Sequence, residues 1–180
     1  MTDKGSEKRF SWEDLGDIDE GRPNLGRLVP VAVYRLLQFT LRDALTEQYD
    51  SDTARRMLVK AGHLSGREFC RNVLDTSLEL GPFLSELQRM LKEWQIGILR
   101  IEEADLEKHD FVLSVAEDLD CSGLEVSDDT VCDYDEGFIA GVFREYTGEK
   151  FSAREVDCWA SGERVCRFEV KADSQDDGVG

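Results

Sequence analysis

Residues 132–141 read Cys132-Asp-Tyr-Asp-Glu-Gly-Phe-Ile-Ala-Gly141, and residues 155–166 read Glu155-Val-Asp-Cys158-Trp-Ala-Ser-Gly-Glu-Arg-Val-Cys166. The first stretch has helical periodicity and predicts a helix over 132–146. In the second, residues 151–159 and 164–170 alternate as strands do, and Ser161-Gly162 supplies the turn between them. The sequence therefore predicts a helix followed by an antiparallel hairpin near the C-terminal end.

The cysteines of this region have a pattern that suits a metal ion. In a hairpin that turns near Gly162, Cys158 and Cys166 lie opposite each other on one face. Cys132 begins the preceding helix, where backbone N–H groups favour a thiolate. Glu155 adds a carboxylate oxygen just before the hairpin cysteines. Three thiolates and one carboxylate make a closed tetrahedral set that suits zinc.

The spacing leaves other interpretations open. Cys158 and Cys166 could be reduced core residues or a cross-strand disulfide, with Cys132 unrelated to them, because their separation is not that of a Cys-x-x-Cys knuckle. Cys121 precedes the helix and could replace one ligand or lie beside the site. We favour a plainer role for Cys121, that of a small buried residue at a turn.

Three helices are predicted ahead of this region, over residues 31–46, 51–78 and 83–94. The first has an apolar set at helical spacing that includes Val33, Leu37 and Leu41. Ser51-Asp52 is the expected cap of the second helix. Residues 96–101 and 111–116 have the alternation of strands. The order predicts an α+β fold, with three N-terminal helices packed on a mainly antiparallel sheet, a further helix and a zinc-bearing C-terminal hairpin.

One domain is expected between two polar tails. Residues 1–22 and 172–180 have the composition of disordered segments, and residues 23–171 contain the periodic elements. The chain of 180 residues is long enough for one substantial core.

Charge and hydropathy exclude several classes of partner. With 22 basic and 39 acidic residues the net charge is −17, whereas nucleic acids and anionic membranes attract clustered Lys and Arg. No apolar run approaches the roughly 20 residues of a bilayer span, and the N-terminal stretch lacks the apolar core of a secretory signal. We therefore expect a soluble, cytoplasmic protein that binds neither nucleic acid nor membrane, with its five cysteines in a reducing compartment.

Several further signals point to structure more than to function. Ten acidic residues and no Lys or Arg lie in 110–143, but Gly137 and Arg144 occupy positions where a calcium loop needs other residues. His63 is expected to be a structural histidine and not a haem ligand. The pairs Gly62-x-x-x-Gly66 and Gly137-x-x-x-Gly141 predict close helix packing.

The Cys132-Asp-Tyr-Asp-Glu-Gly137 stretch, followed by Glu155-x-x-Cys158-x-x-x-Gly162-x-x-x-Cys166, resembles the signature half of the 4-vinyl reductase domain. Residues 22–30 and the Gly62-x-x-x-Gly66 helix agree more loosely, so the resemblance spans about residues 22–171. The family includes a protein linked to bacteriochlorophyll vinyl reduction and the sensor domains of phenol-responsive transcription activators. Its fold is related to that of the TRAPP trafficking subunits.

The resemblance implies a structural zinc ion, an internal pocket and a homodimer. The phenol-sensing branch binds zinc through Cys, Glu, Cys and Cys, which match Cys132, Glu155, Cys158 and Cys166 in order and spacing. The family's apolar pocket makes four aromatic residues candidates for ligand contact: Phe69, Phe83, Phe111 and Phe138. The His and Trp pair of the phenol-sensing pocket has no match here, so the ligand stays unidentified. Related domains pair through their helical side.

The first functional hypothesis is a stand-alone sensor-type domain that binds a small apolar or aromatic molecule. The alternatives are an enzyme or accessory factor in vinyl or tetrapyrrole reduction, and a structural module for an unidentified protein partner. Against an enzyme, the sequence shows no motif for a hydride-carrying cofactor, and the expected metal ligands leave no open position.

Overall fold

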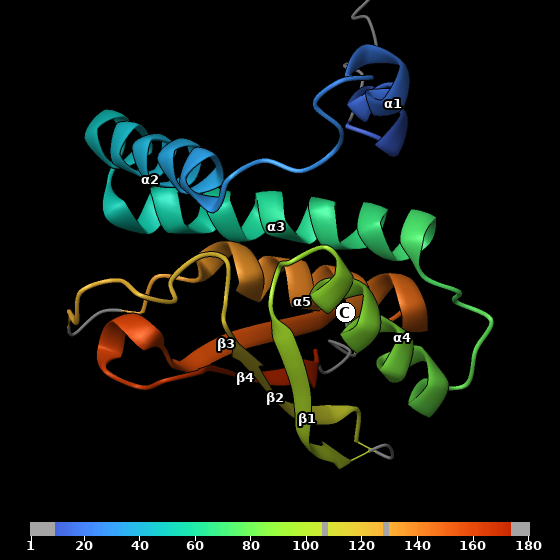
Figure 1. The fold of residues 1–180 in the computed structure, drawn as a ribbon. Helices are drawn as coiled ribbons and strands as arrows, with labels where there is room; N and C mark the ends of the chain where they lie inside the picture. Colours follow the sequence, from blue (N-terminus) through green and yellow to red (C-terminus); the bar gives the residue numbers. More distant parts are fainter. Residues whose placement is uncertain (1–9, 106–107, 128–129, 174–180) are drawn as a thin grey trace, which may run out of the picture.

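The computed structural model describes residues 10–105, 108–127 and 130–173, which form an α+β fold (Figure 1). Four antiparallel strands make one sheet in the order β1-β2-β4-β3. Their bounds are β1 (Ile98–Asp105), β2 (Asp110–Ala116), β3 (Phe151–Asp157) and β4 (Cys166–Ala172). The predicted fold class and the C-terminal hairpin are confirmed.

The helices form layers above this sheet. The long helices are α2 (Val31–Gln48), α3 (Ser51–Val73), α4 (Leu80–Glu93) and α5 (Asp133–Thr147). Helix α5 lies between the sheet and α3, α2 lies on the far side of α3, and α4 packs beside β1 (Figure 1). Shorter turns are η1 (Trp12–Leu15), α1 (Ile18–Gly21) and η2 (Trp159–Ser161). None of the helices in the described part of the chain is long and apolar enough to cross a membrane.

Helix α3 differs from its predicted bounds at both ends. Its N-cap is Asp50, whose side chain accepts a hydrogen bond from the Thr53 N–H at 2.7 Å, and not Ser51-Asp52. The helix ends at Val73 because Leu74 takes an extended conformation. The Asp75 carboxylate then accepts hydrogen bonds from the N–H and hydroxyl of Ser77, which favours a turn over another helical turn.

Helix α2 turns its predicted apolar set outward. Val33 and Leu37 are 53% and 67% exposed, and Gln38 is its buried residue. The inward side is polar: Arg35 donates to the carbonyl of Leu119, and Arg42 pairs with Asp133 at 2.6 Å. The apolar periodicity located the helix correctly but indicated the wrong face, since the segments that α2 covers offer carbonyls and carboxylates.

Helices α3 and α5 cross at four glycines, as the two small-residue pairs predicted. A Cβ atom on Gly62 or Gly66 would lie within 3 Å of α5 backbone, and one on Gly137 or Gly141 within 3 Å of α3 backbone. Such approaches are sterically impossible for any side chain. The glycines therefore set the height of α5 above the sheet.

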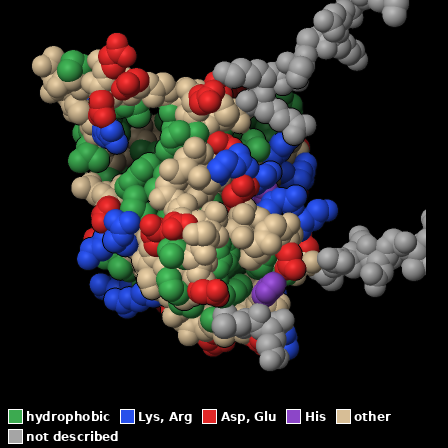
Figure 2. Space-filling view, turned by 90° about the vertical axis from the view of Figure 1, so that its right-hand side faces the viewer, with side chains coloured by type: hydrophobic (Ala, Val, Ile, Leu, Met, Phe, Trp, Pro, Cys, Tyr) green, Lys and Arg blue, Asp and Glu red, His purple; other side chains and the backbone are tan. Residues whose placement is uncertain are grey.

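The surface mixes apolar patches with charges of both signs on the face drawn in Figure 2. Beneath it, aromatic residues of the sheet and of α5 form the centre of the core. Phe111 and Phe168 are 2% and 0% exposed, and Phe111 packs on Phe143 with ring centroids 4.8 Å apart.

Candidate functional site

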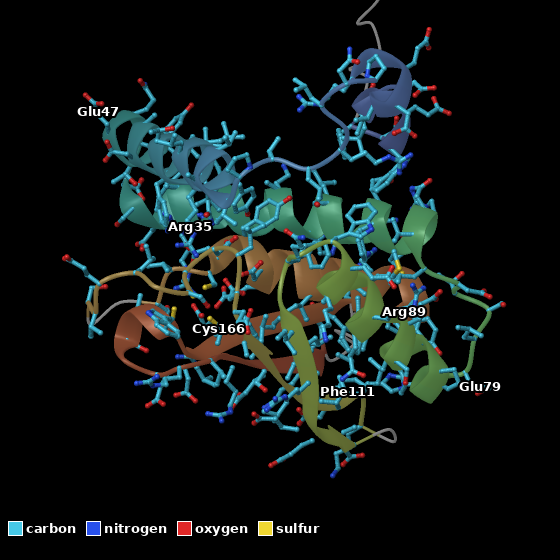
Figure 3. The ribbon with its side chains drawn as sticks, viewed as in Figure 1. Arg35, Glu47, Glu79, Arg89, Phe111 and Cys166 are labelled. Atoms are coloured by element: carbon cyan, nitrogen blue, oxygen red, sulfur yellow. The ribbon has the colours of Figure 1, made fainter. Side chains whose placement is uncertain are left out.

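Four cysteines meet where the hairpin reaches the start of α5. Cys132 is the residue before α5, Cys158 follows β3, Cys166 begins β4, and Cys121 lies in the loop after β2. All four are fully buried and free of disulfides, and Cys166 is labelled in Figure 3. The hairpin positions its pair because Asp157 and Arg167 are register partners, so the next residues outward are Cys158 and Cys166.

The spacing of the sulfurs fits a tetrahedral ion. The Sγ atom of Cys132 lies 3.8 Å from that of Cys158 and 3.8 Å from that of Cys166, and Cys121 Sγ lies 3.0 Å from Cys166 Sγ. All four sulfurs lie within 4.8 Å of one another. A tetrahedral site with Zn–S bonds of about 2.3 Å has sulfurs about 3.8 Å apart. The four cysteines could therefore hold a metal ion with little rearrangement.

The electrostatics of the cluster favour a cation at its centre. Hydrogen bonding, first of all with Cys121, lowers the pKa of Cys158 and raises the pKa of Cys132 and of Cys166. A thiolate at Cys158 is thus stabilised by neighbours that keep their protons. Four thiolates at this spacing would repel one another, whereas a divalent cation would compensate their charge.

Glu155 lies next to the cluster but serves another contact. Its Oε2 accepts a hydrogen bond from the Cys132 N–H at 3.1 Å, and its backbone N–H donates to Glu136 at 2.8 Å. Its Oε1 is buried without a hydrogen-bond partner among the described residues. Burial, with Cys158 nearby, raises the pKa of Glu155 to about 8. The group of potential ligand atoms within 4.8 Å of one another contains Cys121 and not Glu155.

The structure thus brings together three of the four predicted ligands and adds Cys121. The sequence placed Cys121 near the site but favoured a plain buried residue, because it lies in an irregular loop that has no periodicity to position it. The signal for Cys121 was its place in Cys-Ser-Gly, a turn directly before the metal-site helix.

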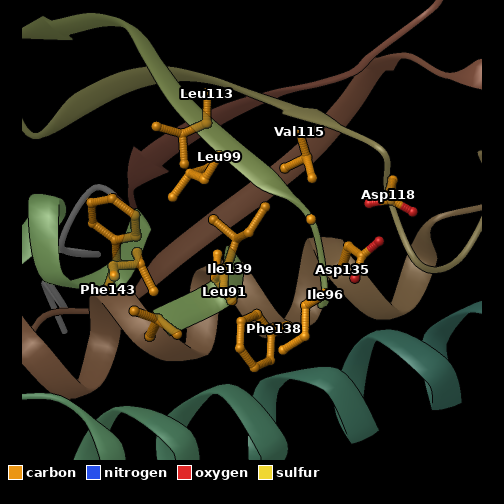
Figure 4. A pocket seen from close by; sticks show the side chains of 13 residues that line it. Leu91, Ile96, Leu99, Leu113, Val115, Asp118, Asp135, Phe138, Ile139 and Phe143 are labelled. Atoms are coloured by element: carbon orange, nitrogen blue, oxygen red, sulfur yellow. The ribbon is translucent and has the colours of Figure 1, made fainter. Parts of the chain in front are cut away.

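A small apolar cavity lies between the sheet, α4 and α5 (Figure 4). Its volume is about 30 Å³, enough for one or two water molecules. Apolar side chains line most of it, and Asp118 and Asp135 stand at one end: Leu87, Leu91, Ile96, Gly97, Leu99, Leu113, Val115, Phe138, Ile139, Val142 and Phe143 complete the lining. We call this space the inner chamber.

A larger cavity of about 240 Å³ adjoins it between α3, α5 and the N-terminal segment. We call it the outer chamber. It shares Ile96, Asp135 and Phe138 with the inner chamber and is lined further by Phe10, Trp12, Leu15, Tyr34, Ser65, Glu68, Phe69, Trp94, Leu119, Asp120 and Tyr134. The shared residues show that the two spaces meet at α5.

Buried carboxyl groups lie at this junction. Asp118 and Asp120 are 4% and 2% exposed. Asp118 accepts hydrogen bonds from the N–H groups of Asp120 and Cys121, and Asp120 accepts one from the Tyr34 hydroxyl at 2.7 Å. Burial raises the pKa of Asp120 to about 7 and the pKa of Asp135 well above its usual range. The sequence showed these residues only as part of an acidic run.

The four aromatic residues predicted for the pocket fall into two groups. Phe69 and Phe138 line the outer chamber, with ring centroids 5.3 Å apart. Phe83 stacks on Tyr146 and Phe111 packs on Phe143, and both are core residues that line neither chamber.

Sequence and structure comparisons agree with the resemblance in the cysteine motif. Residues 111–172 match the family model of the vinyl-4-reductase (V-4-R) domain. Two uncharacterized proteins of Methanocaldococcus jannaschii are 22% and 27% identical over 166 and 147 residues. These alignments cover 91% and 82% of this chain and 89% and 80% of the relatives.

Solved structures share the whole fold. A vinyl-4-reductase family protein from Methanocaldococcus jannaschii has a TM-score of 0.62 at 20% identity, covering 92% of this chain and 99% of its own. The phenol-responsive sensory domain of the transcription activator PoxR, solved with phenol, has a TM-score of 0.63 at 16% identity, covering 82% of this chain and 76% of its own.

A TRAPP subunit has the same fold. The trafficking protein particle complex subunit 3 from Naegleria fowleri, solved covalently bound to palmitic acid, has a TM-score of 0.58 at 13% identity, covering 80% of this chain and 97% of its own. The 4-vinyl reductase resemblance and its relation to the phenol-sensing and TRAPP folds are confirmed: this chain carries a vinyl-4-reductase domain, matched over residues 111–172.

Proposed function

We propose that this protein is a sensor-type domain that binds a small apolar or aromatic molecule in its two chambers. The observation that carries the proposal is the pair of chambers that meet at Phe138, one inside the core and one beneath the N-terminal segment. Pockets for small ligands are mostly apolar, with a few polar groups that orient the ligand. The likeness in fold to a phenol-responsive sensory domain supports this assignment.

The proposal includes a structural zinc ion at the cysteine cluster. Cys132, Cys158 and Cys166 are common to the motif and to the observed cluster, and the sulfur spacing favours Cys121 as the fourth ligand. Glu155, predicted from the motif, is the alternative fourth ligand, and its unpartnered Oε1 is the observation in its favour. Either set leaves no open position, so the metal would stabilise the fold and not perform chemistry.

The metal and the chambers are connected through α5. Cys132 precedes the first turn of this helix, and Asp135, Phe138 and Ile139 of its next turns line the chambers. A metal ion at Cys132 would therefore hold one wall in place, joined to the β3–β4 hairpin. Ligand-dependent movement would then be borne by the N-terminal segment and by α4.

We also infer that the protein works in a reducing compartment such as the cytoplasm. The sulfurs of Cys121 and Cys166 lie 3.0 Å apart as free thiols. Under oxidising conditions two thiols at this distance would be prone to form a disulfide, which would remove two metal ligands.

Native mass spectrometry of the protein purified from its own source tests the proposal. We expect a retained apolar or aromatic small molecule together with one zinc ion per chain. Phe138→Trp, which would fill the junction of the chambers, should lose the small molecule and keep the zinc. Val126→Trp places the same ring at a side chain that is 69% exposed, so it should keep both.

The outcomes separate the functional classes. A retained tetrapyrrole would favour the role in vinyl reduction. A protein that never carries a small molecule, and whose Phe138→Trp variant behaves as the parent does, would contradict the sensor assignment and favour the interaction module.

A further inference from the structure

The outer chamber is surrounded by aromatic rings. Seven of its lining residues are aromatic and come from the N-terminal segment, α2, α3, α5 and the end of α4: Phe10, Trp12, Tyr34, Phe69, Trp94, Tyr134 and Phe138. Trp94 connects two of these elements, with its ring centroid 6.2 Å from Trp12 and 5.3 Å from Phe69. Rings that face a cavity from several sides offer their electron-rich faces to whatever occupies it.

The charged residues of the same lining are all acidic. Glu68, Asp120 and Asp135 line the outer chamber, and no Lys, Arg or His is among the described residues that do so. Glu68 already pairs with Arg71 at 2.6 Å and accepts a hydrogen bond from the Trp12 N–H at 3.0 Å. Asp120 accepts hydrogen bonds from two neutral donors, Tyr34 and Gln38.

Asp135 has hydrogen-bonding capacity that the protein does not use. Its Oδ2 is buried and has no hydrogen-bond partner among the described residues, although the side chain stands at the junction of the two chambers (Figure 4). The two arginines on the inward side of α2 are engaged elsewhere: Arg35 with backbone carbonyls, and Arg42 with Asp133 and the Val131 carbonyl. A buried carboxylate oxygen without a partner is unfavourable, and a donor carried by a ligand would satisfy it.

We propose that the outer chamber binds organic cations, that is, a ligand whose ammonium group meets Asp135 and Asp120 while its apolar body lies against the aromatic rings. Aromatic faces and carboxylates both attract an ammonium group, and a desolvated cation–aromatic contact adds to the ion pair. A neutral apolar ligand would use the rings but leave the Asp135 oxygen unpaired. This inference rests on the proposed function and adds the charge of the ligand to it.

The sizes of the chambers fix how such a ligand would lie. The inner chamber, at about 30 Å³, has no room for more than a methyl-sized group, whereas the outer one has about 240 Å³. The ammonium group therefore points inward to the junction, and the body stays under the N-terminal segment. Phe10, Trp12 and Leu15 of that segment cover the body.

Isothermal titration of the zinc-loaded protein with three probes of matched shape tests the charge. The probes are 2-phenylethylammonium, 2-phenylethanol and 3-phenylpropanoate, which carry a positive, zero and negative charge. We expect the ammonium probe to bind at least about tenfold more tightly than the alcohol, and the carboxylate to show no binding.

Three variants locate the effect. Asp135→Asn should remove most of the preference for the ammonium probe while leaving the affinity for the alcohol unchanged. Trp12→Leu, on the exposed N-terminal segment where folding is not at risk, should weaken the ammonium probe several-fold. Glu103→Gln removes the same charge from the exposed side of β1 and should have no effect. Zinc content, measured for each variant, separates loss of recognition from loss of the metal site.

The results that overturn the inference differ from those that overturn the proposed function. Equal or tighter binding of the alcohol, or an equal loss of preference in Glu103→Gln, contradicts a cation site while leaving a small-molecule sensor intact. Absence of binding by all three probes also contradicts the cation site. The sensor assignment itself falls only if the protein from its own source carries no small molecule.

Discussion

At the scale of single residues, the fourth ligand of the metal site distinguishes this chain from its family pattern. The motif points to Glu155, whereas the sulfur distances point to Cys121. Glu155 instead contacts the backbone N–H of Cys132, a contact that would orient a ligand without binding the ion.

Cobalt substitution should identify the fourth ligand. Thiolate-to-cobalt charge-transfer absorption scales with the number of Co–S bonds, so Cys121→Ser should reduce it to about three quarters of the parent value, as expected for a change from four to three thiolates. Glu155→Gln should leave the absorption unchanged and weaken metal affinity by about tenfold, as is typical when an outer contact is lost.

The reverse pattern would establish the motif-derived set. If Cys121→Ser keeps the full charge-transfer absorption and Glu155→Gln shifts the ligand-field bands, Glu155 is the ligand and Cys121 lies beside the site. Cys70→Ser is the control, because Cys70 is buried in α3 and is not among the clustered sulfurs.

The sequence predicted three cysteines of the cluster because they lie in regular elements. A hairpin register places Cys158 and Cys166 opposite each other, and a helix start places Cys132 near them. Cys121 and Asp118 could not be positioned in this way, since loop residues are brought to a site by tertiary contacts alone. The same reason kept the carboxyl groups of the chamber junction out of reach.

At the scale of elements, the crossing of α3 and α5 depends on the absence of side chains. Each of the four glycines lies where a Cβ atom would meet the backbone of the other helix. Backbone cannot move aside as a flexible side chain can, so any substitution would push α5 toward the sheet and the chambers.

We expect Gly66→Ala and Gly137→Ala each to lower the free energy of unfolding by about 3 kcal/mol or more, because overpacking at a rigid contact forces the helices apart. Gly81→Ala is the matched control, since a Cβ atom at this position in α4 meets nothing within 4 Å. Urea unfolding of the zinc-loaded proteins, followed by circular dichroism, measures the three values. A loss below about 1 kcal/mol at both crossing glycines, on the order of a surface substitution, would show that the crossing adapts.

The elements also show where periodicity is informative and where it is not. Each predicted helix and strand exists, because amphipathic spacing reflects the element itself. The inward face of α2 was missed because its neighbours are polar: Gln38 and Arg42 point inward to carboxyl groups, and Leu37 points outward.

At the scale of the whole molecule, the outward face of α2 and the segment before it form an apolar surface. Leu25, Leu28, Leu36 and Leu37 are 65–76% exposed there. Contiguous exposed apolar residues on a soluble protein mark an interaction surface, and two-fold pairing of identical chains is the commonest way to cover one. We therefore propose that the homodimer expected from the family forms through α2.

Sedimentation equilibrium at micromolar concentration should give twice the chain mass of 20.4 kDa. Leu36→Glu combined with Leu37→Glu should shift the protein to monomers, since two charges would have to be buried at the interface. Val126→Glu, at an exposed apolar residue in the loop after β2, should remain dimeric. A parent protein that sediments as a single chain would exclude this interface.

The measurement that tests the central proposal most directly is ligand affinity with and without zinc. The proposal couples the two because α5 carries Cys132 at its start and Phe138 at the chamber junction. We expect the best-binding aromatic compound from a titration screen to bind the zinc-loaded protein at least about tenfold more tightly than the chelator-treated protein, because loss of the metal releases one wall of the cavity. Equal affinity in both forms, with the fold intact by circular dichroism, would contradict a metal-held cavity, and no binding in either form would contradict the sensor function itself.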